Sequence, residues 1–144
     1  MFWGVDMSVV VGQTFWQYIN NFILGENTPG GGNTICKSGG IIWIVAPNTS
    51  EVSRLWNSRD DAVTTATACT GSTGWFVPTV GQLQNPGYTC RTYWDSYSSA
   101  VYWSSTETNS NVACCVDFSL GYSGDLLKGY GNSCCVRAFR CVTY

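Results

Sequence analysis

The sequence has no histidine and unusually few charged residues. Asp, Glu, Lys and Arg make up 11% of its 144 residues, against about 25% in a typical globular domain. Histidine is the commonest general base and the commonest metal ligand, so its absence argues against most acid–base and zinc chemistry. The net charge is −2 and Lys and Arg form no cluster, so we expect no nucleic-acid partner.

A membrane-spanning run is also missing. The longest uncharged stretch near the N-terminus, Met7–Gly25, contains four amide side chains and is too polar to cross a bilayer. No basic segment precedes it, so a signal peptide is not indicated. We therefore expect no membrane insertion.

Aromatic and cysteine residues are abundant instead. The chain contains seven Trp, eight Tyr and six Phe, whose large side chains can form the hydrophobic core of one domain. Zinc sites favour cysteines separated by two to four residues, whereas here two pairs are adjacent, Cys114-Cys115 and Cys134-Cys135. Asp117 and Asp125 alone are too few for calcium. We predict neither metal nor cofactor, and leave open whether Cys69 and Cys141 are buried thiols.

Hydrophobic periodicity predicts the main elements of the domain. Gly40–Ala46 is a continuous apolar run typical of a buried strand, and Ser53–Cys69 has helical spacing followed by Gly71. Phe15–Ile19 is compatible with either a strand or a helix. We further expect a short helix capped by Thr79, strands at Val101–Ser104, Ala113–Leu120 and Cys135–Val142, and a loop from Gly121 to Gly131.

Several short segments occur in the order found in a known family. They are Ile41–Pro47, the helix ending at Cys69, GWFVPTVGQL (Gly74–Leu83), YWSSTE (Tyr102–Glu107) and VRAFR (Val136–Arg140). From about Gly39 to Val142 the chain resembles the C-terminal domain of the Legionella collagen-like protein and its relatives. The resemblance implies a C-type lectin-like fold, shared with formylglycine-generating enzymes: a compact α+β domain with two helices and twisted antiparallel strands.

Two residues depart from the family's usual motif. Phe76 and Gln82 stand where Arg and Glu are usual, so we expect apolar packing near Trp75 in place of an ion pair. We assign Trp75, Trp103, Phe118 and Val136 to the core. We also expect Arg137 or Arg140 to pair with Glu107 or with a backbone carbonyl.

Residues 108–135 differ in composition from the rest of the chain. The segment is dominated by Asn, Ser, Gly, Cys, Asp, Tyr and Leu. Five residue types cannot be reached by mutating the adenines of Asn codons: Lys, Gln, Glu, Met and Trp. The segment contains a single residue of these types, Lys128. The segment therefore resembles the variable regions of diversity-generating retroelements, whose variable proteins use the same lectin-like fold. Residues that look fixed are Ala113, Val116, Phe118, Gly121 and Lys128.

Tyr side chains supply contact area at low entropic cost, whereas Ser, Gly and Asn adapt to different partners. We therefore predict a ligand-binding surface in this segment. Its candidate residues are Asn109, Asn111, Cys115, Asp117, Ser119, Tyr122, Asp125, Leu126, Leu127, Tyr130, Asn132 and Ser133.

These inferences combine into one functional hypothesis. Residues 33–144 form a C-type lectin-like, non-enzymatic domain that binds a host surface protein or glycan, at a virion surface or outside a cell. Residues 1–32 form an arm that mounts the domain on other virion proteins or oligomerises it, with a trimer as our expectation. Two alternatives remain: a capsid or tail decoration subunit without an external ligand, and a secreted cellular adhesin.

Overall fold

The computed structural model describes residues 15–144, with side chains from Tyr18 onward. They form an α+β domain built on a three-stranded sheet, in the order β1-β2-β8, and a five-stranded sheet, in the order β3-β7-β4-β5-β6. The α+β class is thus confirmed. The helices are α1 (Phe15–Asn20), α2 (Asp61–Thr70) and α3 (Val80–Gln82), and the strands are β1 (Asn33–Ser38), β2 (Ile41–Val45), β3 (Val52–Arg54), β4 (Val101–Glu107), β5 (Val112–Asp117), β6 (Tyr122–Leu127), β7 (Cys134–Val136) and β8 (Phe139–Thr143).

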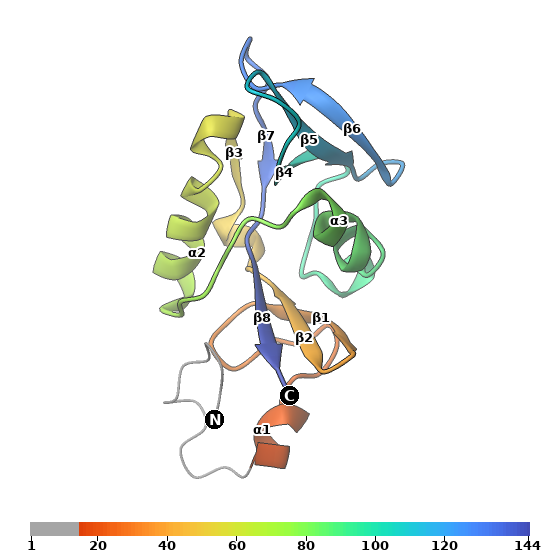
Figure 1. Cartoon of the computed structure of the whole chain (residues 1–144). Coiled ribbons are helices and arrows are strands. Elements are labelled where there is room, and N and C mark those ends of the chain that lie inside the picture. The colour runs from red at the N-terminus through yellow and green to blue at the C-terminus, as the bar shows by residue number, and fades with distance from the viewer. Residues whose placement is uncertain (1–14) are drawn as a thin grey trace.

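The smaller sheet lies beside α1 and the C-terminus, and the larger sheet occupies the opposite end of the domain (Figure 1). Strand pairs are antiparallel except that of β4 with β7. None of the helices within residues 15–144 is long and apolar enough to cross a membrane.

The C-terminal strand is divided between the two sheets. Our prediction of a single strand over Cys135–Val142 is wrong, because β7 and β8 are separated at Arg137 and Ala138. The Arg137 guanidinium is fully buried and pairs with Glu51 at 3.0 Å and Asp95 at 3.1 Å. These ion pairs fix the chain where it passes from one sheet to the other.

The predicted arginine partners are partly corrected. Glu107 pairs with Lys128 and not with either arginine. The carbonyl alternative is confirmed, because Arg137 donates to the Ala46 carbonyl at 3.0 Å and Arg140 donates to the Pro29 carbonyl at 3.1 Å.

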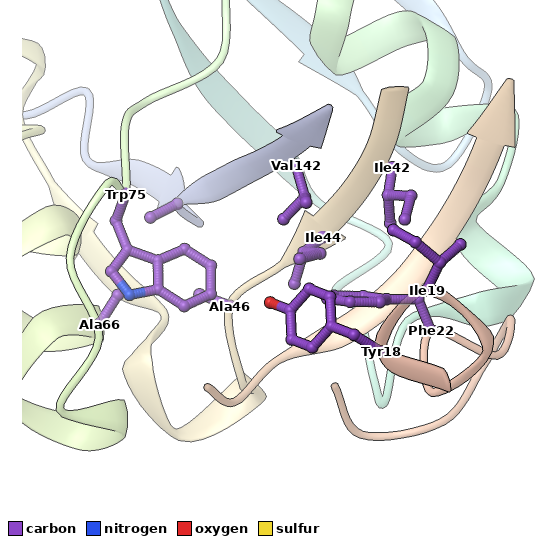
Figure 2. Packing of buried hydrophobic residues seen from close by; sticks show 10 residues of the cluster. Tyr18, Ile19, Phe22, Ile42, Ile44, Ala46, Ala66, Trp75 and Val142 are labelled. Atoms are coloured by element: carbon purple, nitrogen blue, oxygen red, sulfur yellow. The ribbon is translucent and has the colours of Figure 1, made fainter. Parts of the chain in front are cut away.

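The predicted apolar strand is confirmed as β2, which lies between β1 and β8. Ile42 and Ile44 of β2 pack against Tyr18, Ile19 and Phe22 in one buried cluster (Figure 2). The open choice at Phe15–Ile19 is resolved as helix α1. The predicted mounting segment 1–32 therefore contributes Tyr18, Ile19 and Phe22 to the core, whereas its residues 1–14 lie outside the described part of the chain.

The predicted helix Ser53–Cys69 is wrong in about its first half. Ser53 and Arg54 belong to β3 and pair with Cys135 and Cys134. The indole N–H of Trp56 donates to the Ser104 carbonyl at 2.8 Å, which holds the next segment against β4. The helix α2 starts only at Asp61, and it ends at the predicted stop, Gly71, in a left-handed conformation.

The second predicted helix is confirmed as α3. The hydroxyl of Thr79 accepts from the Gln82 N–H, and the Gln82 side chain accepts from the Thr79 N–H, forming a capping box. Trp75 packs among apolar side chains, as expected, and the Arg140 guanidinium also lies 5.0 Å from the centre of its ring.

Both faces of the larger sheet carry buried side chains. Tyr102, Val116 and Phe118 lie in one cluster with Leu83 and Trp94. Trp103, Ala113, Cys115 and Val136 lie in another, together with Trp56 and Ala62. All four residues assigned to the core, Trp75, Trp103, Phe118 and Val136, are buried as predicted. Because the sheet is covered on both sides, the alternation in β5 does not separate a core face from a solvent face.

The predicted loop Gly121–Gly131 is wrong. Its first half is strand β6, paired along its whole length with β5 from Tyr122↔Asp117 to Leu127↔Val112. Ser123, Gly124 and Asp125 are poor strand formers, so the hydrogen-bonded edge of β5, and not local propensity, makes this segment a strand.

Candidate ligand-binding surface

Residues 108–135 form the outer hairpin of the larger sheet and the loop that leads into β7 (Figure 1). Most of the predicted site residues are on its surface. Tyr122 and Tyr130 are 71% and 92% exposed. The other exposed members are Asn109, Asn111, Ser119, Asp125, Leu127 and Ser133, and Asp117 and Asn132 are half-buried.

Cys115 is wrongly placed in the predicted surface. It is 6% exposed, lies in the cluster of Trp103 and Val136, and donates its thiol to the Gly124 carbonyl at 3.4 Å. Leu126 is half-buried and packs against the same cluster. Both side chains face the side of the sheet that Trp56 and α2 cover.

The residues predicted to be fixed have structural reasons to be so. Ala113, Val116 and Phe118 are buried in the two clusters. Gly121 has φ of +84°, and a Cβ placed on it would lie 2.7 Å from Cζ of Tyr88. Within residues 108–135, constrained and solvent-facing positions are therefore interleaved along the chain.

Lys128 is the fifth fixed position and is 8% exposed. Its ammonium pairs with Glu107, donates to the Ser110 carbonyl at 3.1 Å and lies 4.3 Å from the centre of the Trp56 ring. Lys128 thus anchors the end of β6 to β4 and to the segment before α2.

A groove of about 630 Å³ lies beside this anchor. One wall belongs to the segment before α2 and contains Leu55, Asn57 and Ser58. The opposite wall belongs to the predicted variable segment and contains Ser110, Asn111 and residues 127–130. The volume is within the usual range for small-ligand pockets, and the lining combines apolar side chains, neutral hydrogen-bonding groups and the Lys128 side chain.

Sequence reasoning missed the first wall. Helical spacing places Leu55 on the buried face of a helix, but in the structure it precedes α2 and is partly exposed. No motif singles out Asn57 or Ser58, and only the packing of Trp56 beneath them brings this segment to the groove.

Tyr130 has an uncommon backbone conformation. Its φ is +57°, and among the described residues it is the sole non-glycine with positive φ. This conformation costs a non-glycine residue roughly 1 kcal/mol. Gly129 and Gly131 flank it, and the nearly fully exposed ring gains little from intramolecular packing.

The predicted residues fall into two groups at opposite ends of the hairpin. Asn109, Asn111, Leu127 and Tyr130 are at the groove end. Asp117, Ser119 and Tyr122 are at the β5–β6 turn, as the pairing Asp117↔Tyr122 shows. A single small ligand in the groove would not touch both groups, whereas a macromolecular partner could cover the whole hairpin.

Hydrogen bonds hold the polar side chains of this surface. Asp125 accepts from the Thr108 hydroxyl at 3.0 Å and from the Cys114 thiol at 3.4 Å. Asp117 accepts from both the hydroxyl and the backbone N–H of Ser119, and these hydrogen bonds lower the pKa of the Asp117 carboxyl. Both carboxylates are therefore oriented before a ligand arrives.

A smaller hollow of about 370 Å³ lies elsewhere on the larger sheet. Ser53, Val101, Leu126 and residues 133–135 line it. Leu126 and Ser133 thus border this hollow and not the groove.

Four of the thiols are in environments that suppress their reactivity. Burial raises the pKa of Cys134 and Cys141 to about 11, and it raises the pKa of Cys115 and Cys135 in the same direction. Cys141 is half-buried, whereas Cys69 is exposed, which settles the question left open for these two. Within residues 15–144 no three His, Cys, Asp or Glu side chains gather where a metal could bind.

No protein-family model matches this chain, and a search of curated proteins finds no match.

Proposed function

We propose that this protein is a non-enzymatic binding module that contacts a host surface protein or glycan through residues 108–135. In this proposal a C-type lectin-like scaffold displays a diversified surface, at a virion surface or outside a cell. The α+β architecture with two sheets is compatible with such a scaffold.

One observation carries the proposal: the residues of the segment that look fixed are buried or sterically restricted, and most of those that look variable are exposed. Diversification would require this arrangement. Ala113, Val116, Phe118 and Lys128 are buried, and Gly121 has no room for a side chain. The candidate variable positions between them are exposed, except that Cys115 is buried and Asp117, Leu126 and Asn132 are half-buried. A chain organised in this way can change its contact residues without losing the interactions that hold the hairpin.

The conformation of Tyr130 supports binding at the groove end. Strained backbone conformations persist where function favours them, and exposed Tyr residues are common energetic anchors of interfaces. Leu55 and Leu127 add partly exposed apolar surface next to it.

The environment of the cysteines supports a module without chemistry of its own. A nucleophilic cysteine needs a lowered pKa, but burial raises the pKa of Cys115, Cys134, Cys135 and Cys141. The chain also has no histidine to act as a base.

Binding to a glycan array and to an array of purified bacterial surface proteins tests the proposal. We expect a ligand whose affinity falls roughly tenfold or more in the Leu127→Ser, Tyr130→Ser double variant. Tyr144→Ser is the matched control, because Tyr144 is exposed but follows β8, in the other sheet. Equal losses in both variants, or no binding by the unmodified protein, would contradict the proposal and favour a decoration subunit.

The gene itself tests the diversification step. A reverse transcriptase beside it, with a near-repeat of the region coding for residues 108–135, is the expected arrangement. Substitutions between the two copies should fall at adenines of the repeat. A genomic neighbourhood with neither feature would refute diversification. The binding proposal would then be tested by the array experiments alone.

The proposed mounting role is tested by a short deletion. Removing residues 1–14 leaves Tyr18, Ile19 and Phe22 in the core. We expect the shortened protein to fold but to lose its attachment to other virion proteins or its trimeric assembly. Unchanged assembly in size-exclusion chromatography with light scattering, and unchanged incorporation into particles, would refute this role.

A further inference from the structure

Two cysteines outside the binding surface belong to neighbouring segments of the fold. Cys36 is in β1, and Cys90 follows the helical turn Leu83–Tyr88, which contacts β1. Both side chains pack against the cluster that contains Leu83 and Trp94. The Cys36 thiol adds to burial in raising the pKa of the Cys90 thiol, which is consistent with the two thiols being close together.

This arrangement is compatible with a disulfide, which needs the two Cα atoms to be roughly 4.4–6.8 Å apart. The strand β1 contacts both the turn before Cys90 and the turn after it, so the backbone around the two cysteines is already close. Both cysteines are half-buried, so a small oxidant can approach them. Cys115 and Cys134 also share a cluster, but both are buried.

We propose that Cys36 and Cys90 form a disulfide in an oxidising environment and thereby tie β1 to the turn that precedes Trp94. The inference is independent of the proposed ligand. It does bear on location, because such a bond persists outside the reducing cytosol.

The reaction balances with a disulfide oxidant such as glutathione disulfide. One protein thiolate attacks a glutathione sulfur and releases one glutathione thiolate. The second protein thiolate attacks the resulting mixed disulfide and releases the other. Two electrons pass from the protein to the oxidant, and the protons of the two cysteines end on the two glutathione molecules.

The rate should depend strongly on pH. Burial, followed by the proximity of Cys36, raises the pKa of Cys90, so its thiolate is scarce near neutrality. We expect oxidation to accelerate as the pH rises from 7 to 9. Once formed, the bond closes a loop of about 55 residues, which should raise the melting temperature by roughly 10 °C through restriction of the unfolded chain.

Peptide mapping tests the pairing. The folded protein is incubated with glutathione disulfide, remaining thiols are blocked with N-ethylmaleimide, and the chain is cut with trypsin. Cleavage after Lys37, Arg59 and Arg91 places Cys36 in peptide 1–37 and Cys90 in peptide 60–91, which also contains Cys69. The Cys69→Ser background removes that ambiguity and makes Cys90 the single cysteine of its peptide.

We expect peptides 1–37 and 60–91 to be recovered as one cross-linked species in the Cys69→Ser protein, together with the rise in melting temperature. Cys36→Ser and Cys90→Ser should each lose both effects. Recovery of Cys36 as a blocked thiol, a glutathione adduct or a link to any other cysteine would overturn the proposal. The mapping in the Cys69→Ser background decides the question even if Cys36→Ser or Cys90→Ser fails to fold.

Discussion

Substituting Gly121 by alanine should destabilise the domain much more than the same change elsewhere in the predicted variable segment. Gly121 combines φ of +84° with the Tyr88 ring directly beside it, and the added Cβ would lie 2.7 Å from Cζ of Tyr88. Tyr88 cannot move freely, because its ring packs edge-on against Phe118 with 5.3 Å between ring centres. Gly121 therefore tests whether the positions that look fixed are constrained by the fold.

Substitutions of two other glycines in the segment separate the cost of left-handed backbone strain from the cost of steric overlap with Tyr88. Gly131 has φ of +76° but open space around its missing side chain, so Gly131→Ala should cost only the left-handed strain, about 1 kcal/mol. Gly124 has open space and no positive φ, so Gly124→Ala should stabilise by about 0.5 kcal/mol, because it restricts the unfolded chain. Gly121→Ala should cost about 3 kcal/mol, because overpacking against Tyr88 adds 1–3 kcal/mol to the strain.

Urea denaturation monitored by tryptophan fluorescence measures all three, with the free energy of unfolding obtained by linear extrapolation. The predicted order of stability is Gly124→Ala, the unmodified protein, Gly131→Ala and then Gly121→Ala. If Gly121→Ala is no less stable than Gly131→Ala, the Tyr88 ring imposes no constraint. If it matches Gly124→Ala, the steric account of this fixed position is refuted.

Three further perturbations test other parts of the account. Tyr130→Gly should raise the free energy of unfolding by about 1 kcal/mol, because it relieves the left-handed strain of a side chain that packs against little; a loss of stability in urea would show that the ring contributes to the fold. Stability should fall as the pH rises from about 9 to 11, because the folded-state pKa values of Cys134 and Cys141 are raised to about 11 and the unfolded chain loses these protons first. Denaturation curves recorded in reducing buffer at several pH values should show a smaller loss of stability with pH for the Cys134→Ala, Cys141→Ala double variant. An unchanged loss of stability would exclude these thiols as its cause. Tyr102→Phe should cost about 2 kcal/mol by thermal denaturation, because the buried hydroxyl donates to Glu51 and accepts a backbone N–H; a cost near zero would mean that water replaces the hydroxyl.

The sequence predicted well those elements that are determined locally. The apolar run of β2 and the Thr79 cap of α3 need no distant partner to be recognised. The end of α2 at Gly71 likewise follows from the freedom of glycine to adopt a left-handed conformation.

The elements that failed depend on partners far along the chain. Ser53 and Arg54 continue the helical spacing of residues 55–69, yet they pair with β7 as a strand. The break at Arg137 arises from ion pairs with Glu51 and Asp95, which sequence spacing does not reveal.

The binding surface was predictable in composition but not in shape. Exposed Tyr122 and Tyr130 followed from the unusual residue content of the segment. The burial of Cys115 did not, because alternation predicts one buried face and the sheet has two. The groove wall that contains Leu55 also could not be predicted from the sequence, because it depends on the packing of Trp56 against β4.

The division of residues 108–135 into surface and constrained positions can be measured with a library in which each residue is randomised in turn and the displayed protein is sorted by its resistance to protease. We expect most substitutions to be accepted at Asn109, Ser119, Tyr122, Asp125 and Tyr130. Residues 113, 115, 116, 118, 121 and 128 should accept few, because they are buried or have no room for a side chain. If Tyr122, Asp125 and Tyr130 prove as intolerant of substitution as Val116 and Phe118, residues 108–135 are not a surface that can vary without unfolding the domain.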